Sequence, residues 1–242
     1  MNSIIKWFEN WFETLYNTFI VSDRWITLVD GLKATLIMTI GALLIGVVIG
    51  TAVAVVKVFA AGVKGKTLSD KVLIVFDKLC NIYITVIRGI PVVVQLLISF
   101  FIIFTTAKDG LWVATLTFGI NSGAYVAETI RSGIMAIDVG QMEAGRSLGF
   151  SKLQTMWLVI LPQAIKNILP AIGNEMIALL KETSVAGYVA VIDITKAGNQ
   201  IKNTTYDQIN PILLVALVYL VIVMFLTYVV GTLERRLRKN ER

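Results

Sequence analysis

The stretch ATLIMTIGALLIGVVIGTAVAVV, residues Ala34–Val56, contains 23 consecutive residues without a charge. About 20 helical residues cross the ~30 Å hydrocarbon core of a bilayer, so this stretch is long enough to be a transmembrane helix. Uncharged runs of similar length recur at Gly89–Ala107, Gly110–Ala127 and Pro211–Leu233. A fifth run, Asn167–Leu180, is interrupted only by Glu175. The pattern predicts an all-α integral membrane protein with five transmembrane helices.

The composition of the whole chain agrees with this prediction. Of the 242 residues, 56% are hydrophobic and 16% are charged, with a mean hydropathy of +0.77, whereas a soluble domain has about 25% charged residues. The net charge of +6 would also suit a nucleic-acid-binding protein, but that function needs cations clustered on a soluble face. Here they lie between apolar runs, so we expect a lipid membrane as partner and no nucleic acid.

Residue types limit the chemistry further. The chain has no His and a single cysteine, Cys80, so a His/Cys metal site and a His-dependent nucleophile are excluded. Cys80 fits a small apolar packing residue. We therefore expect no catalytic residue and no metal site in this chain.

The first 24 residues form a distinct amphipathic segment. Glu9 and Glu13 interrupt the continuous apolar stretch that a cleavable signal would need. Apolar side chains recur instead at helical spacing, with two tryptophans beside them; the set is Phe8, Phe12, Leu15, Phe19, Trp7 and Trp11. Residues 1–24 are expected either to lie in the membrane interface, which favours aromatic side chains, or to pack against the other helices. The transmembrane domain is expected to occupy residues 25–242.

The Lys and Arg residues between the runs predict the orientation of the chain. Three segments carry 14 of them, namely residues 57–78, 131–166 and 235–242, the first with Lys57, Lys64, Lys66, Lys71 and Lys78. The segments that would face the opposite side carry seven, and Arg88 is left unassigned. Because cytoplasmic loops are enriched in cations, we expect a cytoplasmic C-terminus and an N-terminus outside.

Two stretches approach the phosphate-loop pattern G-x-x-x-x-G-K-[ST] without completing it. GQMEAGRS, residues Gly140–Ser147, has Arg146 where lysine is required, and AAGVKGKT, residues Ala60–Thr67, begins with alanine. A working loop also needs the strand and helix of an α/β domain around it. Neither stretch has room for one, so we expect no nucleotide site.

The segment EAGRSLGFSKLQTMWLVILP, residues Glu143–Pro162, is charged and punctuated by glycines between two apolar runs. Gly145 and Gly149 are four residues apart, which in a helix places both on one face. Such a face is flat and would let another protein approach closely. The alternative is an ordinary turn within a cytoplasmic connection.

These residues resemble the EAA motif of ABC importer permeases, with Glu143, Ala144 and Gly145 followed by Gly149 and Pro162. Three further stretches are similar to the polar amino-acid branch of that family: RGIPVVVQL (Arg88–Leu96), NSGAYVAETIRSGI (Asn121–Ile134) and LPQAIKNILPAIGNEMIALLKETS (Leu161–Ser184). The likeness extends from about Trp25 to the C-terminus. Gly145 departs from the second alanine of the motif, Ile90 stands where threonine is usual, and Val159 replaces isoleucine.

The resemblance implies a five-span permease subunit that imports polar amino acids across a bacterial inner membrane by alternating access. It implies a cytoplasmic coupling helix, within a loop at about 131–162, that docks on a separate ATPase subunit through Glu143, Ala144, Gly145, Gly149 and Pro162. ATP and magnesium would then bind that partner, and this chain would hold no cofactor. Other implied partners are a second permease copy or a paralogue, and an extracytoplasmic amino-acid-binding protein.

Polar residues inside the apolar runs are the candidate substrate contacts, because ionisable groups in spans usually face a cavity or a partner. Asn167, Asn174 and Lys181 form one helical stripe, with Glu175 beside it, and Asn121, Tyr125 and Glu128 form another. Two facing stripes would suit a zwitterion. The candidates are therefore Glu175, Asn174, Asn121, Tyr125, Lys181 and Arg88.

The same polar residues also fit roles that involve no substrate. Asn side chains commonly join helices by hydrogen bonds, and Arg88 would ordinarily extend to the interface. Two other classes of protein compete with the permease. A secondary transporter would typically show internal repeats, and none is convincing here. A membrane scaffold that only recruits a cytoplasmic partner would not need polar stripes within its spans.

Overall fold

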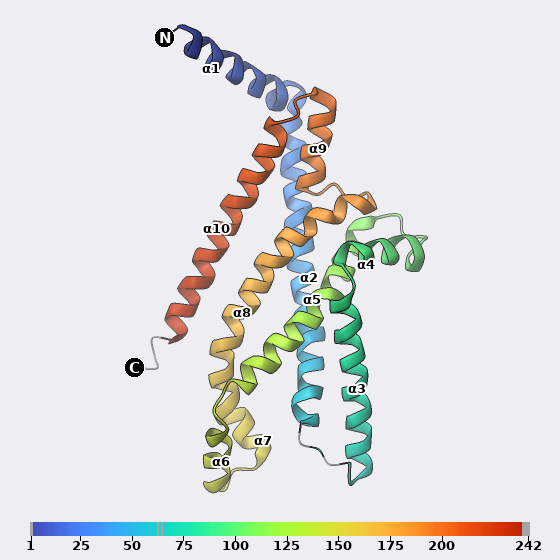
Figure 1. The fold of residues 1–242 in the computed structure, drawn as a ribbon, viewed down its shortest axis with the longest axis vertical. Helices are drawn as coiled ribbons and strands as arrows, with labels where there is room; N and C mark the ends of the chain where they lie inside the picture. Colours follow the sequence, from blue (N-terminus) through green and yellow to red (C-terminus); the bar gives the residue numbers. More distant parts are fainter. Residues whose placement is uncertain (1, 62, 64, 239–242) are drawn as a thin grey trace.

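The computed structural model describes residues 2–61, 63 and 65–238, and these residues form helices and short connections without a strand. Figure 1 shows an elongated bundle whose chain runs repeatedly between two ends. The α-helices of the described part are α1 Asn2–Leu15, α2 Arg24–Ala60, α3 Leu68–Gly89, α4 Val92–Ile98, α5 Gly110–Met135, α6 Val139–Ser147, α7 Lys152–Thr155, α8 Leu161–Glu182, α9 Ile194–Thr205 and α10 Asn210–Arg238. The all-α prediction is confirmed.

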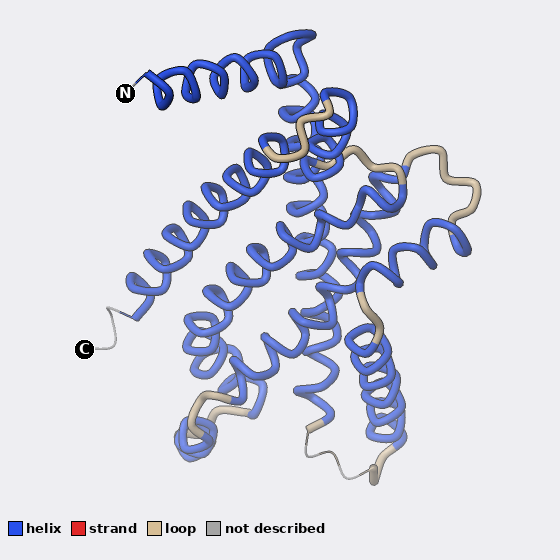
Figure 2. The backbone as a smooth tube through the Cα atoms, turned by 45° about the horizontal axis from the view of Figure 1, so that its top comes forward, coloured by secondary structure: helices blue, strands red, loops and turns tan. Residues whose placement is uncertain are grey.

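The long helices α2, α3, α5, α8 and α10 run between the two ends of the bundle. The α6–α7 pair projects at one end, and α10 runs toward that same end. The helices α1 and α9 lie at the other end, as the two views in Figures 1 and 2 agree. The first and last described helices, α1 and α10, therefore begin and end toward opposite ends of the bundle.

By length and composition, three described helical stretches can cross a membrane: Glu9–Ala60, Lys152–Val189 and Asn210–Leu237. The bent pair of α3 and α4 raises this number to as many as four. The expected third span, α5, is not among them, although its 26 residues are long enough. It is less apolar because it carries polar residues such as Asn121 and Ser122, which are buried inside the bundle. The count of five spans stays a prediction.

The second expected span is corrected by the structure. Residues 68–89, expected to lie mostly in a loop, form the helix α3, so Lys71 and Lys78 are helical, while Lys64 lies outside the described residues. The apolar run that begins at Gly89 instead follows a sharp bend of 104° between α3 and α4. A search for uncharged runs does not find α3, because this helix carries charged residues.

Small residues bring α2 and α5 into close contact. Gly46, Gly50 and Ala54, which share one face of α2, are all buried. A Cβ atom at Gly46 would lie 2.8 Å from the Ser122 hydroxyl, and one at Gly50 would lie 2.7 Å from Val126. A methyl group at either position would therefore push the two helices apart, which is the behaviour of a small-x-x-x-small packing face.

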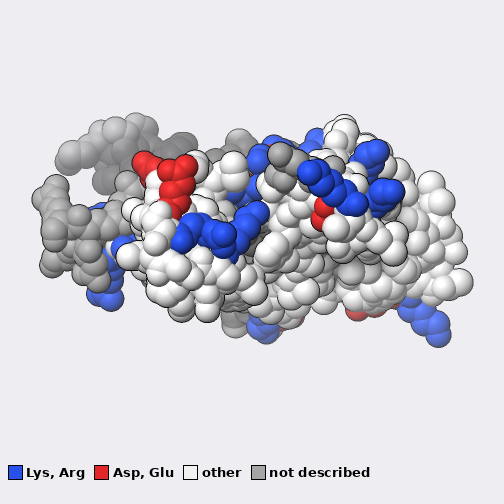
Figure 3. Space-filling model, turned by 90° about the horizontal axis from the view of Figure 1, so that it is seen from below, with Lys and Arg blue, Asp and Glu red and all other residues white. Residues whose placement is uncertain are grey.

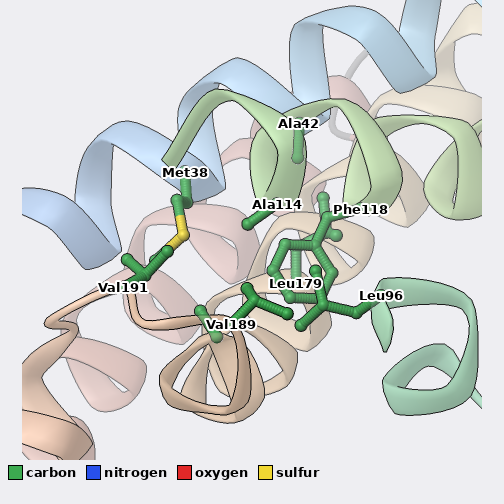
Figure 4. Close-up of a cluster of buried hydrophobic side chains, with 9 residues drawn as sticks. Met38, Ala42, Leu96, Ala114, Phe118, Leu179, Val189 and Val191 are labelled. Atoms are coloured by element: carbon green, nitrogen blue, oxygen red, sulfur yellow. The ribbon is translucent and has the colours of Figure 1, made fainter. Parts of the chain in front are cut away.

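An apolar cluster fills the bundle near α4, where α2, α5, α8 and the segment after α8 also meet. Leu96 of α4, Phe118 of α5 and Leu179 of α8 are completely buried there, and their side chains converge in Figure 4. Met38 and Ala42 of α2 and Val189, which follows α8, complete its sides. The bend after α3 is what brings Leu96 into this cluster.

The N-terminal segment is attached to the connection between α9 and α10. The Trp11 indole donates a hydrogen bond to Asn210 (3.3 Å), and the Thr18 hydroxyl donates one to Asp207 (2.9 Å). Phe12 is exposed and Phe19 is buried, so one part of the apolar face of this segment packs against the bundle and another part is exposed. An apolar groove of about 1030 Å³ separates α1 from the start of α10. The side chains of Trp7 and Phe8 lie outside the described residues.

Asp207 is held in its ionised form by this attachment. Partial burial opposes ionisation, but hydrogen bonds from Asn210, Thr18 and the Ile209 amide outweigh it and lower the pKa of Asp207. Hydrogen bonds to the ionised Asp207 thus help to hold the N-terminal segment to the α9–α10 connection.

Cations are prominent at the end of the bundle that carries α6 and α7. Seen from that end, the surfaces of Lys and Arg are spread over the molecule and those of Asp and Glu are confined to small areas (Figure 3). The described members of the cation-rich segments include Lys57, Arg146 and Arg235, whereas Lys239 and Arg242 lie outside the described residues.

Candidate functional site

The helix α6 has well-defined ends that the sequence specifies locally. Asp138 caps its N-terminus by accepting a hydrogen bond from the Gly140 amide (2.6 Å). At its C-terminus the Phe150 amide donates to the Gly145 carbonyl and the Gly149 amide donates to the Arg146 carbonyl, both at 3.1 Å. These two bonds form a Schellman motif, in which Gly149 adopts a left-handed φ of 90°.

The expectation that Gly145 and Gly149 share one helix face is wrong. Gly145 is buried against α7, where an added Cβ would lie 2.8 Å from the Thr155 hydroxyl and closer still to its methyl group. Gly149 follows the end of α6 and has open space around it. The two glycines therefore have different roles: the first allows α6 and α7 to pack, and the second reverses the chain.

The start of α7 completes this turn. The Ser151 hydroxyl accepts a hydrogen bond from the Gln154 amide (3.2 Å), and the Gln154 side chain accepts one from the Ser151 amide (2.8 Å). This capping box starts α7 at Lys152, three residues after Gly149. The α6–α7 pair is consequently a compact unit of fixed geometry.

The outer surface of α6 combines charge with apolar side chains. Glu143, Ala144 and Arg146 are exposed, and Leu148 is exposed over 79% of its surface. Pro162 of the same predicted set lies apart from them, in the first turn of α8. The unit is nevertheless joined to α8, because the Gln163 side chain donates to Gln141 of α6 (3.4 Å) and to the Val159 carbonyl (2.9 Å).

On α8, the polar stripe has the geometry that its spacing predicts, but it faces away from α5. Asn167, Asn174 and Lys181 are all exposed on the surface of this chain. Glu175 points elsewhere: it is half-buried, and its Oε1 accepts a hydrogen bond from the Ser122 hydroxyl of α5 at 2.9 Å. The partner of Glu175 thus comes from another helix.

On α5, the second stripe contacts α3 and α4 rather than α8. Asn121 is buried and donates to Gln95 of α4 (3.3 Å). Glu128 forms an ion pair with Arg88 of α3, whose guanidinium carbon also lies 5.0 Å from the centre of the Tyr125 ring. The two stripes therefore do not face each other within this chain.

Arg88 itself lies in the last turn of α3 and not at the beginning of a span. Its ion pair with Glu128 and its contact with Tyr125 join α3 to α5, as does the Tyr83 hydroxyl, which donates to the Ile120 carbonyl at 2.6 Å. These contacts pair the charge of Arg88 at the junction of α3 and α5.

Two residues of this region were not singled out from the sequence, namely Ser122 and Gln95. Ser122 has no distinctive local signal, because only the packing of α5 on α8 brings it to Glu175. Gln95 does have a signal: it follows Pro91 by four residues, and a proline leaves a helix carbonyl without its amide donor.

The arrangement is suited to binding and movement rather than to covalent chemistry. Among the described residues, no group of three or more Cys, Asp or Glu side chains is placed to hold a metal ion. A half-buried carboxylate, amides and a hydroxyl lie inside a helical bundle, and a small helical unit projects from one end. The polar groups can bind a polar molecule within the bundle, and the projecting helical unit can be displaced by a partner outside it.

Known proteins are similar to this chain over most of its length. The arginine transport system permease protein ArtQ of Bacillus subtilis is 34% identical over 217 residues, which cover 88% of this chain and 94% of the relative. The glutamine transport system permease protein GlnP of Escherichia coli is also 34% identical, over 87% of this chain and 93% of its own length.

Solved structures extend the likeness to three dimensions. The crystal structure of an amino acid ABC transporter with histidines matches with a TM-score of 0.78 and 36% identity, covering 90% of this chain and 98% of that one. The family described as binding-protein-dependent transport system inner membrane component matches residues 59–239, about three quarters of the chain. This chain therefore belongs to the family of inner membrane components of binding-protein-dependent transport systems.

Proposed function

We propose that this chain is the permease subunit of an ATP-driven importer of polar amino acids. Membership of the family supports a membrane transport subunit, and relatives at 34% identity carry arginine and glutamine transport in their names. The observation that carries the proposal is the α6–α7 unit, which projects from a bundle of membrane helices and is joined to α8 through Gln163 and Gln141. The helix that carries Glu175 is thus connected directly to a surface outside the bundle.

In this proposal a separate ATPase subunit docks on α6, the coupling helix. Glu143, Ala144 and Arg146 supply an exposed polar surface, and Leu148 supplies an apolar anchor. Gly145 and Gly149 act indirectly by shaping the unit, and Pro162 starts the helix that transmits its movement. ATP and magnesium bind to the partner, and this chain contributes no cofactor and no catalytic residue.

Movement of α6 reaches the bundle through α8. Gln163 and Glu175 are twelve residues apart on this helix, which corresponds to about 18 Å along its axis. A shift of α6 that pulls on Gln163 therefore displaces Glu175 relative to Ser122 on α5. Alternating access follows if closure of the ATPase dimer brings two such units together.

Glu175 is the proposed contact for the ammonium group of the substrate. It is an acceptor inside the bundle whose described protein partner is a neutral hydroxyl, so it retains capacity for a cation. Asn174 and Lys181 lie on the exposed face of the same helix and are proposed to face a second permease copy or paralogue. Asn121 binds α4, and Tyr125 contacts Arg88 of α3, so we assign these three residues to the wall of the path.

The proposed orientation places the C-terminus and α6 in the cytoplasm of a bacterial cell and the N-terminus outside. The excess of cations at the α6 end supports it. The end that carries α1 and α9 would then receive an extracytoplasmic amino-acid-binding protein.

Reconstitution tests the function directly. The chain, with the ATPase that copurifies with it and its binding protein, is placed in liposomes and given labelled arginine, glutamine or leucine. ATP-dependent uptake of a polar amino acid, with leucine as the apolar comparison, is the expected result. Uptake driven by an ion gradient without ATP would identify a secondary transporter, and no uptake despite partner binding would identify a scaffold.

A further inference from the structure

The break between α3 and α4 leaves a backbone group without its usual partner. In a continuous helix the Ile87 carbonyl would accept a hydrogen bond from the amide of residue 91. That residue is Pro91, which has no N–H. An unsatisfied carbonyl inside a membrane costs several kcal/mol, so a broken spanning helix is stable only if another group supplies the missing donor.

The side chain of Gln95 supplies it. Its Nε2 donates to the Ile87 carbonyl at 2.6 Å and to the Ile90 carbonyl at 2.7 Å. Its Oε1 accepts from the Asn121 amide of α5 at 3.3 Å. Gln95 is only 8% exposed, and both of its donor hydrogens are used. One amide therefore joins the end of α3, the start of α4 and the middle of α5.

The next residue, Leu96, shows what this junction positions. Leu96 is completely buried against Phe118 and Leu179 in the apolar cluster (Figure 4). Phe118 lies one helical turn before Ser122 on α5, and Leu179 lies one turn after Glu175 on α8. Because the two helices are antiparallel, the cluster lies on the side of the Ser122–Glu175 pair that is nearer to α1.

We propose that Gln95 is a positioning residue that latches α4, so that Leu96, Phe118 and Leu179 form an apolar plug between Glu175 and the membrane face that carries α1. The proposal rests on the proposed function in taking Glu175 as the substrate contact. The helix α3 is held to α5 by Tyr83 and Arg88, which leaves α4 as the element that can swing at Gly89–Pro91. Opening the path from the α1 side then requires Gln95 to release its carbonyl partners.

Thiol labelling tests the latch without transport. In a Cys80→Ser background, a Ser122→Cys reporter lies one turn beyond the plug, and its reaction with a membrane-impermeant maleimide is timed in sealed vesicles of both orientations. Gln95→Met keeps the length of the side chain but removes both donor hydrogens and the acceptor oxygen. Thr117→Val is the matched control, because it removes a buried hydroxyl whose bond to the Val113 carbonyl (2.8 Å) stays within α5.

We expect Gln95→Met to label at least about tenfold faster than the reference, from the α1 side only, since three buried hydrogen bonds that favour the closed state are lost. Thr117→Val should label at the reference rate. An assembled Gln95→Met protein that labels at the reference rate overturns the latch. If that variant does not assemble, the shorter amide in Gln95→Asn is labelled instead. Failure of both to assemble would make Gln95 a folding residue and likewise reject the latch.

The labelling needs neither ATP nor the ATPase, so its outcome is separate from that of the proposed function. A chain that imports no amino acid could still show faster labelling in Gln95→Met. Conversely, a reconstituted importer with unchanged labelling would retain its function and lose only the latch.

Discussion

Replacing Gly145 by alanine would restore the second alanine of the EAA motif, yet the structure predicts that it impairs this protein. The new Cβ would lie 2.8 Å from the Thr155 hydroxyl, 3.1 Å from the Thr155 Cβ, and closer still to the Thr155 methyl group. Real Cβ atoms essentially never approach another heavy atom within 3.0 Å. The helices α6 and α7 must therefore separate, which displaces the docking surface.

Two opposing free-energy terms set the size of this effect. Overpacking at a buried contact costs roughly 1–3 kcal/mol, while alanine is favoured over glycine inside a helix by up to about 1 kcal/mol. Restoring the close packing that docking requires therefore costs about 1 kcal/mol, which corresponds to about a fivefold weaker docking affinity.

Titration of the purified ATPase subunit against the permease in nanodiscs measures this change. We expect Gly145→Ala to raise the ATPase concentration that gives half-maximal hydrolysis by about fivefold. Thr155→Ala removes the obstructing methyl and hydroxyl groups, and the double variant should recover most of the affinity. The single variant Thr155→Ala is the control, because it also loses the hydrogen bond from the Thr155 hydroxyl to the Ser151 carbonyl.

A Gly145→Ala variant that binds the ATPase as tightly as the reference protein would contradict the expected separation of α6 and α7. A double variant that binds no better than Gly145→Ala would show that the steric conflict with Thr155 is not the cause.

Other parts of the chain give further expected outcomes. Glu175→Gln should weaken amino-acid-stimulated ATP hydrolysis by about ten- to a hundredfold while the complex still assembles, as expected for loss of a charge-assisted hydrogen bond of roughly 1.5–3 kcal/mol; unchanged uptake kinetics would contradict the site. Gly149→Arg should reduce ATPase docking more than Gly149→Asn does, because Asn tolerates the left-handed backbone, and equal docking by all three proteins would exclude a role for this turn. A cysteine in residues 235–238 should resist an impermeant thiol reagent in intact cells and one near Lys108 should react, so the opposite pattern would reverse the orientation. The pKa of Asp207 is lowered in the folded state. The contribution of Asp207 to stability is therefore present above its ordinary pKa of 3.8 and is lost as pH falls through the lower folded pKa. Acid-induced detachment of the N-terminal segment, followed by Trp fluorescence, should show this dependence, and the Asp207→Asn variant should not.

Much of the architecture could be predicted from the sequence because it depends on local composition. The uncharged runs marked α2, α5 and α10, and the run interrupted only by Glu175 marked α8. These features need no knowledge of partners, since burial in a membrane is decided by the polarity of the residues themselves. The charged helix α3 escaped the same test, because Asp70, Lys71, Asp77 and Lys78 gave it the appearance of a loop.

The roles of individual polar residues depended on the tertiary structure. Spacing placed Asn121, Tyr125 and Glu128 on one face of a helix, but could not tell which neighbour that face meets, and the neighbours are α3 and α4. Gly145 and Gly149 had helical spacing, but the helix ends between them. The assignments of substrate and coupling residues stay predictions.

The sequence by itself determined that this chain is helical, belongs in a membrane and carries the EAA-like segment, because each of these properties is written in contiguous residues. Only the tertiary structure decided that Glu175 meets Ser122, that Thr155 fills the space beside Gly145 and that Gln95 closes the break at Pro91. Those contacts join residues from different helices, and their geometry depends on how the helices pack, which no local pattern encodes.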